Sequence, residues 1–462
     1  MMRGIAFRLL RPAAVAAGLG SLIQSIPQAS AETLQQALRR TYQNNPQLNA
    51  DRARQRATDE TVPQALAGYR PQISAGFEAG PNYQYARPGN GPSFVQPLTL
   101  NLNVDMNLFD GGRTSNSVRS AESAVLAGRA TLRGVEQTVL LMAVTAYLDV
   151  LRDQAIRDLV ANNITALSET LRIARVRYEK GDARRTDMAQ AEARLARGKA
   201  DLAVAVANLA ASQATYRQVV GAQPADLAFP RPADGLMPAS LTLAVRTALE
   251  GHPAVRAAVH AVDGAQTDVR VIAGELAPSL RVTGTLQRVF GQSRDDDPAA
   301  LPVNIGPQLT VPIYEGGEVY ARVRQAKETV AQRRAELEAT RDDVRSDMRS
   351  AWGTFESARA SVPANEKAVE AAEVALAGVT RESLEGARTI LDVLNSQQEL
   401  LAARSNLVSA RRDLVVASYG ALAAMGVLTH KKLDLATRRY RPETHYEQVR
   451  DLGETARTPD GR

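Results

Sequence analysis

The stretch LTLNLNVDMNLFD (98–110) alternates apolar and polar residues, and two glycines follow it. Its even positions from Leu98 to Leu108 are apolar, and the odd positions between them are Thr, Asn or Asp. This period of two predicts a β-strand with one apolar and one polar face. The pattern fits a water-soluble sheet whose apolar face meets a core, and equally a membrane barrel whose apolar face meets lipid.

Three further segments alternate in the same way, so we expect four strands, at about 71–85, 94–109, 278–290 and 302–314. Lengths of ten or more residues suit a tilted bilayer crossing. Four strands cannot close a barrel, and an open edge cannot lie in lipid because its backbone groups would lack partners. The sheet is therefore either small and soluble, or pooled from several chains, and three chains would supply twelve strands. The pooled barrel is favoured because the helices pair with one another and leave no core for the apolar face.

The first 31 residues predict a signal peptide. Arginines at positions 3, 8 and 11 precede a short apolar run (13–23), and Ala29-Ser30-Ala31 matches a small-x-small cleavage site. An N-terminal membrane anchor is the alternative, but the apolar run is short for a span. We expect an exported chain that begins at Glu32.

Composition excludes several classes of protein. The 462 residues include no cysteine, so neither a disulfide nor a thioether lipid anchor is expected. A net charge of +6 without a basic stripe does not indicate nucleic-acid binding. The four histidines lack metal-ligand spacing, and no nucleophile elbow or phosphate loop occurs, so we expect no enzyme, metal or cofactor. The acidic triplet 295–297 is interpreted as a solvated loop tip rather than a calcium site.

The chain repeats itself at an offset of about 205 residues. NLFDGGR (107–113) falls on PIYEGGE (312–318), Gly181 on Gly386, and Asp187 on Asp392. The sequence therefore predicts one structural unit used twice. The expected division is a signal peptide (1–31), a first repeat (32–223), a linker (224–238), a second repeat (239–428) and a polar tail (429–462) that is either loosely ordered or partly wrapped on the helices.

Each half predicts three helices around its strand pair. A helix of about 35 residues comes first, a very long helix follows the strands, and another helix follows a glycine. The expected ranges are 33–67, 111–179 and 183–220, and then 241–275, 316–384 and 388–425. Heptad-spaced apolar residues support the long helix from Val118 onward. Pro363 predicts a kink rather than an end.

Two segments carry a family resemblance. YEKGDARRTDMAQAEARL (178–195) and LEGARTILDVLNSQQELLAARSNL (384–407) resemble the paired tip segments of TolC-type outer-membrane efflux proteins, and LFDGG and IYEGG open the long helices as in that family. The absence of cysteine matches the non-lipidated TolC branch. The resemblance implies an α+β membrane protein: a homotrimer with a twelve-stranded barrel in outer-membrane lipid and a helical coiled-coil tunnel in the periplasm. It also implies docking with a periplasmic adaptor protein and an inner-membrane pump, and export of drugs or secreted proteins.

The resemblance also assigns roles at the helical tip. Gly181 and Gly386 lie in the tip turns where adaptors dock. Thr186, Asp187 and Arg388 occupy latch positions that link helices, and Asp392 and Asn395 occupy ring positions at the constriction. Asn395 departs from the acid found in the family, as Ser383 departs from a latch tyrosine. The alternative is that Asp187 and Asp392 simply favour helix N-termini.

The polar strand faces add two pore-lining candidates, Glu78 and Asp105. The rival interpretation of the whole chain is a soluble periplasmic coiled-coil adaptor or scaffold. That class would explain the heptads and the signal peptide, but not four alternating strands placed symmetrically beside Gly-Gly helix starts. No motif identifies the exported substrate.

Overall fold

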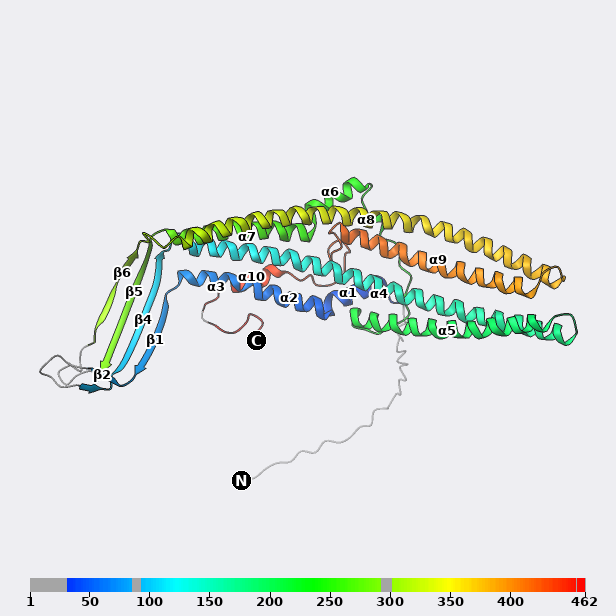
Figure 1. Cartoon of the computed structure of the whole chain (residues 1–462), viewed down its shortest axis with the longest axis horizontal. Helices are drawn as coiled ribbons and strands as arrows, with labels where there is room; N and C mark the ends of the chain where they lie inside the picture. Colours follow the sequence, from blue (N-terminus) through cyan, green and yellow to red (C-terminus); the bar gives the residue numbers. More distant parts are fainter. Residues whose placement is uncertain (1–30, 85–92, 292–300, 454, 462) are drawn as a thin grey trace, which may run out of the picture.

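The computed structural model describes residues 31–84, 93–291, 301–453 and 455–461. The expected signal peptide up to residue 30 and the acidic triplet 295–297 lie outside the described residues. The molecule is elongated (Figure 1). A β-sheet lies at one end, two turns that each join a pair of helices lie at the other end, and the helices run between them (Figure 1). The expected combination of long helices and four antiparallel strands is confirmed.

The sheet contains four antiparallel strands in the order β1-β4-β5-β6, which are Gln72–Ala79, Leu98–Phe109, Ser279–Phe290 and Val303–Thr310. Two short strands, β2 (Asn82–Gln84) and β3 (Ser93–Val95), pair separately beyond its end. The two strands that were expected to be continuous, over 71–85 and 94–109, are each divided into two shorter strands. Each is interrupted beside a proline, Pro81 or Pro97, which has no N–H to donate to a ladder.

Two helices of equal length form the axis of the molecule. α4 (Arg113–Glu179) and α8 (Glu318–Leu384) each contain 67 residues, which corresponds to about 100 Å at the usual helical rise. Both start after a Gly-Gly pair whose second glycine has a positive φ, +79° at Gly112 and +85° at Gly317, so the glycines permit the sharp turn from strand to helix. α8 continues through Pro363, as expected.

The two helices expected over 33–67 and 241–275 are each broken. The first is α1 (Leu34–Asn44), α2 (Pro46–Asp59) and α3 (Thr61–Leu66), and the second is α6 (Leu241–Gly251) and α7 (Pro253–Ala273). A proline disfavours the helical conformation for the residue before it. Asn45 and His252 accordingly have ψ of 124° and 133°, and their side chains accept hydrogen bonds from the next helix.

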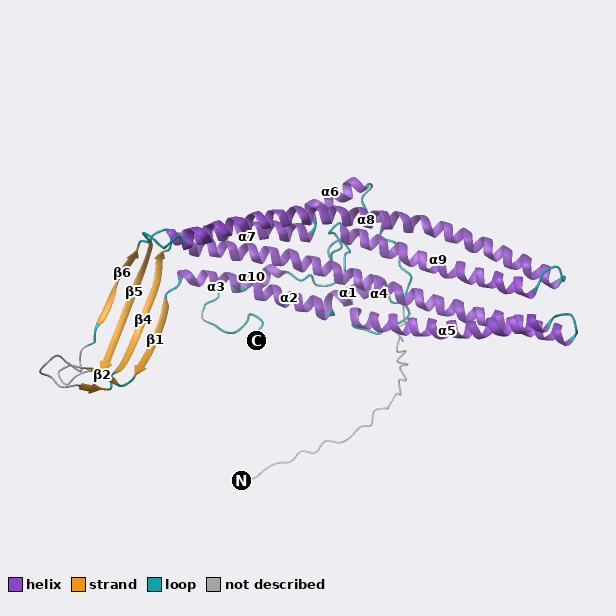
Figure 2. Cartoon of the chain, viewed as in Figure 1, coloured by secondary structure: helices purple, strands orange, loops and turns teal. Residues whose placement is uncertain are grey.

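The helices pack as one curved layer, which Figure 2 shows beside the sheet. α5 (Arg185–Val220) packs on α4, and α9 (Ile390–Ala424) packs on α8 and α4, in the half that ends at the tip; in the other half α7 packs on α4 and α8. Short 3₁₀ turns at Ala67–Tyr69 and Gly274–Leu276 lead into β1 and β5, and a third lies at Asp234–Leu236. The layer places the sheet and the tip at opposite ends.

The middle of the molecule contains the main hydrophobic core. Tyr147 of α4 is fully buried there, and its hydroxyl oxygen lies 2.6 Å from the carbonyl oxygens of both Glu32 and Ala228. Glu32 also forms an isolated parallel bridge with Leu227. Tyr147 of α4 therefore holds the linker between the two halves against Glu32, near the start of the described chain.

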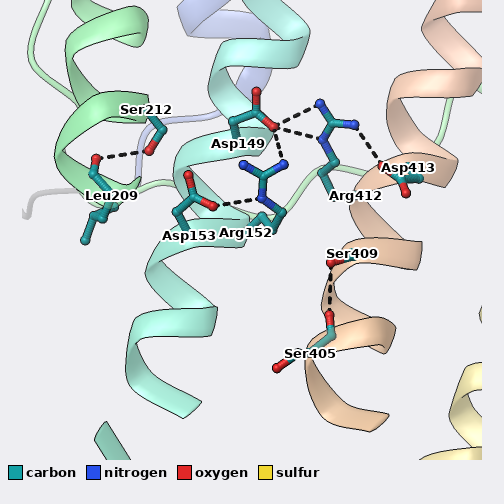
Figure 3. Close-up of polar contacts among 9 residues, drawn as sticks. All are labelled: Asp149, Arg152, Asp153, Leu209, Ser212, Ser405, Ser409, Arg412 and Asp413. Atoms are coloured by element: carbon teal, nitrogen blue, oxygen red, sulfur yellow. Dashed lines mark hydrogen bonds and ion pairs between the residues drawn. The ribbon is translucent and has the colours of Figure 1, made fainter. Parts of the chain in front are cut away.

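An ion-pair network crosses from α4 to α9 (Figure 3). Arg412 of α9 approaches Asp149 Oδ1 with Nε at 3.0 Å and Nη2 at 2.9 Å, and Arg152 pairs with both Asp149 and Asp153.

Among the described helices, α4 alone has an 18-residue window apolar enough for a membrane span, at a mean hydropathy of 1.3, and half of that window is buried inside the chain. α4 is thus a core helix.

The segment after α9 lies partly on the helices, as one of the two expectations for the tail states. We name residues 429–453 the C-terminal strap. It runs back along α2 and includes helix α10 (Pro442–Val449), coloured red in Figure 1. Tyr440 N donates to the Tyr42 hydroxyl at 3.0 Å, His445 Nδ1 lies 3.1 Å from Asp59 Oδ2, and Val449 is fully buried. Scattered apolar and aromatic residues, hidden in a polar composition, fix the strap.

Candidate functional site: the helical tip and the sheet

The two tip turns have the same backbone design. Gly181 and Gly386 have φ of +84° and +81°. One residue later, Asp182 N donates to Arg177 O and Ala387 N donates to Glu382 O, both at 2.9 Å. These bonds satisfy carbonyls at the ends of α4 and α8 in the manner of a Schellman motif. The glycines therefore set the shape of both tip turns.

Asp392 caps the N-terminus of α9. Its Oδ2 accepts from Thr389 N at 3.0 Å and from Thr389 Oγ1 at 2.8 Å. Hydrogen bonds from the side chain and backbone of Thr389 hold the pKa of Asp392 below its usual value, because they favour the charged form. Asp187 makes the corresponding bond to Arg184 N at 3.1 Å. Both aspartates thus have the capping role that was the alternative interpretation, and Asp392 carries its charge at neutral pH.

The expected latch residues are not in contact within one chain. Arg388 Nε pairs instead with Glu382 Oε2 at 3.0 Å, in its own turn. Thr186 is exposed beside Asp187 in the other turn. Any link between Arg388 and the Thr186–Asp187 pair would therefore require either a neighbouring chain or a rearrangement of the turn.

Other residues join the two halves at the tip. Arg194 Nη2 donates to Asn395 Oδ1 at 2.9 Å, and Arg177 Nη2 donates to the carbonyl oxygen of Ser383 at 3.0 Å. A small buried cluster lies beside them, formed by Leu167, Ala174, Ala191, Ile390 and Leu394. The acceptors of these two hydrogen bonds are the Asn395 side chain and the Ser383 carbonyl, and both residues depart from the family pattern. Nothing in the sequence distinguishes Arg177 and Arg194 from the many other arginines.

The sheet has one polar and one apolar face, except that Arg288 of β5 pairs with Leu100 in the apolar row. On the polar face Gln72 pairs with Asp105, and Glu78 pairs with Thr99. Because Gln72 and Glu78 are six residues apart, Glu78 and Asp105 lie about 20 Å apart at the rise of a strand. The two pore-lining candidates therefore share a face but occupy opposite ends of it.

The apolar face has no cover among the described residues of the chain. Two cross-strand rows define it, Ile73–Val104–Gly284–Ile305 and Ala75–Leu102–Leu286–Val303. Ile73 is 67% exposed, Phe77 70% and Ile305 75%. Within the part of the chain that the structure describes, no helix packs on this face, and β1 and β6 are the edges of the four-stranded sheet. An apolar face of this extent requires another apolar environment.

Among the described residues, no group of three or more His, Asp or Glu side chains is placed to hold a metal ion.

Comparisons with known proteins agree with this geometry. The family described as outer membrane efflux protein matches residues 37–222 and 244–427. The outer membrane efflux protein BepC of Brucella suis is 40% identical over 439 residues, covering 94% of each chain. The outer membrane protein TolC of Vibrio cholerae is 27% identical, over 91% of this chain and 96% of its own. The crystal structure of the Campylobacter jejuni CmeC outer membrane channel aligns with a TM-score of 0.76 and 16% identity, over 96% of this chain and 98% of that one.

The chain belongs to the outer membrane efflux protein family. It is a channel of the TolC type that spans the outer membrane and extends into the periplasm, and it is not an enzyme. The soluble adaptor or scaffold interpretation is thereby excluded. The family works as trimeric channels in tripartite efflux.

Proposed function

We propose that three copies of this chain pool their sheets into a twelve-stranded barrel, and that the helices below form a closed tunnel. The observation that carries the proposal is the uncovered apolar face, together with the two unpaired edges at β1 and β6. In lipid, an open edge would leave backbone groups without partners, whereas edges joined between chains would satisfy them. The polar face, with Glu78 and Asp105, then lines the pore.

The proposal extends to chain organisation and partners. The chain is a non-lipidated member, with a signal peptide (1–31), two copies of one unit (32–223 and 239–428), a linker (224–238) and the tail that contains the strap. A periplasmic adaptor docks on the turns around Gly181 and Gly386, and an inner-membrane pump delivers drugs or secreted proteins to the tunnel. The matching design of the two turns supports a shared docking surface.

The assembly is tested by fractionation and by gene deletion. The protein should remain with outer membranes after a high-salt wash and be extracted by detergent as a trimer. Deletion should either sensitise cells to drugs or stop export of a secreted protein, and the outcome identifies the class of substrate. Release of the protein into the periplasmic fraction by salt would contradict the proposal.

We also propose that Asp392 contributes a carboxylate ring to the constriction, with Asn395 one turn further along. Three carboxylates near a threefold axis would attract cations. The charge of Asp392 can be separated from its capping bond, because Asp392→Asn retains an acceptor for Thr389. Both Asp392→Ala and Asp392→Asn should raise single-channel conductance and weaken block by polyvalent cations. Asp201→Asn, an exposed aspartate of α5 outside the tip turns, is the control for loss of one carboxylate. Unchanged conductance in both Asp392 variants would remove this residue from the constriction.

A further inference from the structure

A cavity lies between the C-terminal strap and the body of the molecule. It has a volume of about 620 Å³ and is bounded by α2, α4, the start of α7 and the strap. We name it the strap cavity. Sites that bind small molecules commonly have volumes of roughly 300–1,000 Å³, so the strap cavity is large enough for a compact ligand with several functional groups.

Basic side chains dominate its lining. They are Arg52, Arg129, Arg133, Arg256, Lys431, Lys432 and Arg439, against a single carboxylate, Glu136. Arg52 is occupied, since it donates to Asn49 Oδ1 and to Tyr42 O, both at 2.9 Å. Glu136 Oε1 already accepts from the backbone N–H of His430 at 2.7 Å. None of the other six basic side chains forms an ion pair within the described residues.

Arg129 has two buried hydrogen-bond donors without an acceptor in the described structure. Its Nε and Nη2 atoms are shielded from solvent, and neither has a hydrogen-bond acceptor among the described residues. Its guanidinium lies 5.1 Å from the ring centroid of Tyr446, which is a face contact and supplies no acceptor along the N–H directions. Buried donors are almost always paired in native structures. Because both atoms are shielded from water, they do not face the open volume of the cavity, and a bound ligand would contact the exposed basic side chains Arg256, Lys431, Lys432 and Arg439.

The basic side chains come from both sides of the cavity. Lys431, Lys432 and Arg439 belong to the strap. Arg129, Arg133 and Arg256 belong to α4 and α7. Like charges that face one another across a partly enclosed space repel. An anion held between them would remove the repulsion and join the strap to the body.

We propose that the strap cavity binds a compact polyanion, bearing phosphate or carboxylate groups, that fastens the C-terminal strap to α4 and α7. Guanidinium groups form paired hydrogen bonds with either kind of anion, so the shared chemistry is that of an oxyanion. Arg133 and Arg256 act on the body side, and Lys431, Lys432 and Arg439 act on the strap side. The site is separate from the tunnel tip and the sheet.

The test uses the purified full-length channel in detergent at physiological ionic strength. Pyrophosphate and citrate are titrated by calorimetry as the phosphate and carboxylate probes, with sodium chloride at matched ionic strength as the reference. Hydrogen exchange of residues 429–449 is then measured with and without the tighter-binding probe. The site variant is Arg133→Gln combined with Arg256→Gln. The matched control is Arg324→Gln, an exposed arginine of α8 that does not line the cavity.

Saturable binding of either probe, with slower exchange of the strap, is the expected result. The double variant should weaken binding at least tenfold and abolish the added protection, while Arg324→Gln should bind like the original protein. If neither probe binds beyond the salt reference, or if the double variant binds as tightly as the control, the proposal is overturned. Should the double variant fold poorly, Lys431→Gln with Lys432→Gln tests the strap side of the same cavity, with the same two outcomes.

Discussion

The hydrogen bond between Arg194 and Asn395 offers a way to strengthen closure of the tip. The donor Nη2 and the acceptor Oδ1 are 2.9 Å apart, and the acceptor is a neutral amide. In Asn395→Asp the same geometry would become an ion pair. Because the contact joins α5 to α9 across the two halves, its strengthening should favour the closed tip.

The size of the effect follows from the exposure of the pair. Asn395 is exposed and Arg194 is only partly buried, and exposed ion pairs contribute about 0.2–1 kcal/mol. If three subunits open together, the closed state gains about 0.6–3 kcal/mol, and the ratio of open to closed channels should fall by about 3-fold to 140-fold. The fall should be smaller in concentrated salt, which screens exposed charges.

The assay is the open fraction of single channels in planar bilayers at low and high salt. A double-mutant cycle separates the ion pair from the extra negative charge at the constriction, with Asn395→Asp measured in the original protein and in Arg194→Ala. The fall in open fraction should depend on Arg194. An equal response with and without Arg194 would refute the reasoning, because the new charge would then act through something other than this contact.

Three further predictions concern other parts of the chain. Thr389→Val removes the side-chain bond that depresses the pKa of Asp392, so the pH at which cation block is lost on acidification should rise; an unchanged midpoint would contradict it. Tyr147→Phe leaves two buried carbonyls without their shared donor and should lower the free energy of unfolding by about 1–3 kcal/mol. Tyr419→Phe, whose hydroxyl has no hydrogen-bond partner among the described residues, should cost less in the same thermal unfolding measurement, and equal losses would count against the role of Tyr147. Ile305→Lys should deplete the outer-membrane trimer, because a lysine on the lipid face costs about 2–4 kcal/mol at the bilayer midplane. Asn304→Lys, on the other face of the strand, should still assemble and should shift conduction toward anions. The reverse pattern would contradict the assignment of the apolar face to lipid.

The sequence predicted the parts of the fold that depend on periodicity. The strand LTLNLNVDMNLF became β4 over Leu98–Phe109, and the long helices begin at Gly-Gly and end near Gly181 and Gly386 as expected. The first helices, expected to be continuous over 33–67 and 241–275, are broken at Asn45-Pro46 and His252-Pro253. There proline disfavours the helical conformation of the preceding residue.

Long-range side-chain contacts could not be predicted in the same way. The partners of Asn395 and Ser383 are arginines some two hundred residues away, and no local signal identifies them. The polar composition of the tail predicts loose order or partial wrapping on the helices, but it does not identify the residues that dock, such as the fully buried Val449. The capping role of Asp392 was foreseeable from its place at the start of a helix, whereas the role that we propose for it at the constriction depends on the arrangement of three chains.

The pooled barrel is the central claim, and the number of chains in the detergent-extracted particle tests it most directly. Native mass spectrometry of the extracted protein should show three copies, with every strand edge satisfied by a neighbouring copy. A stable monomer that keeps its sheet folded in detergent would contradict the account, because its apolar face and its edges at β1 and β6 would then need no partner.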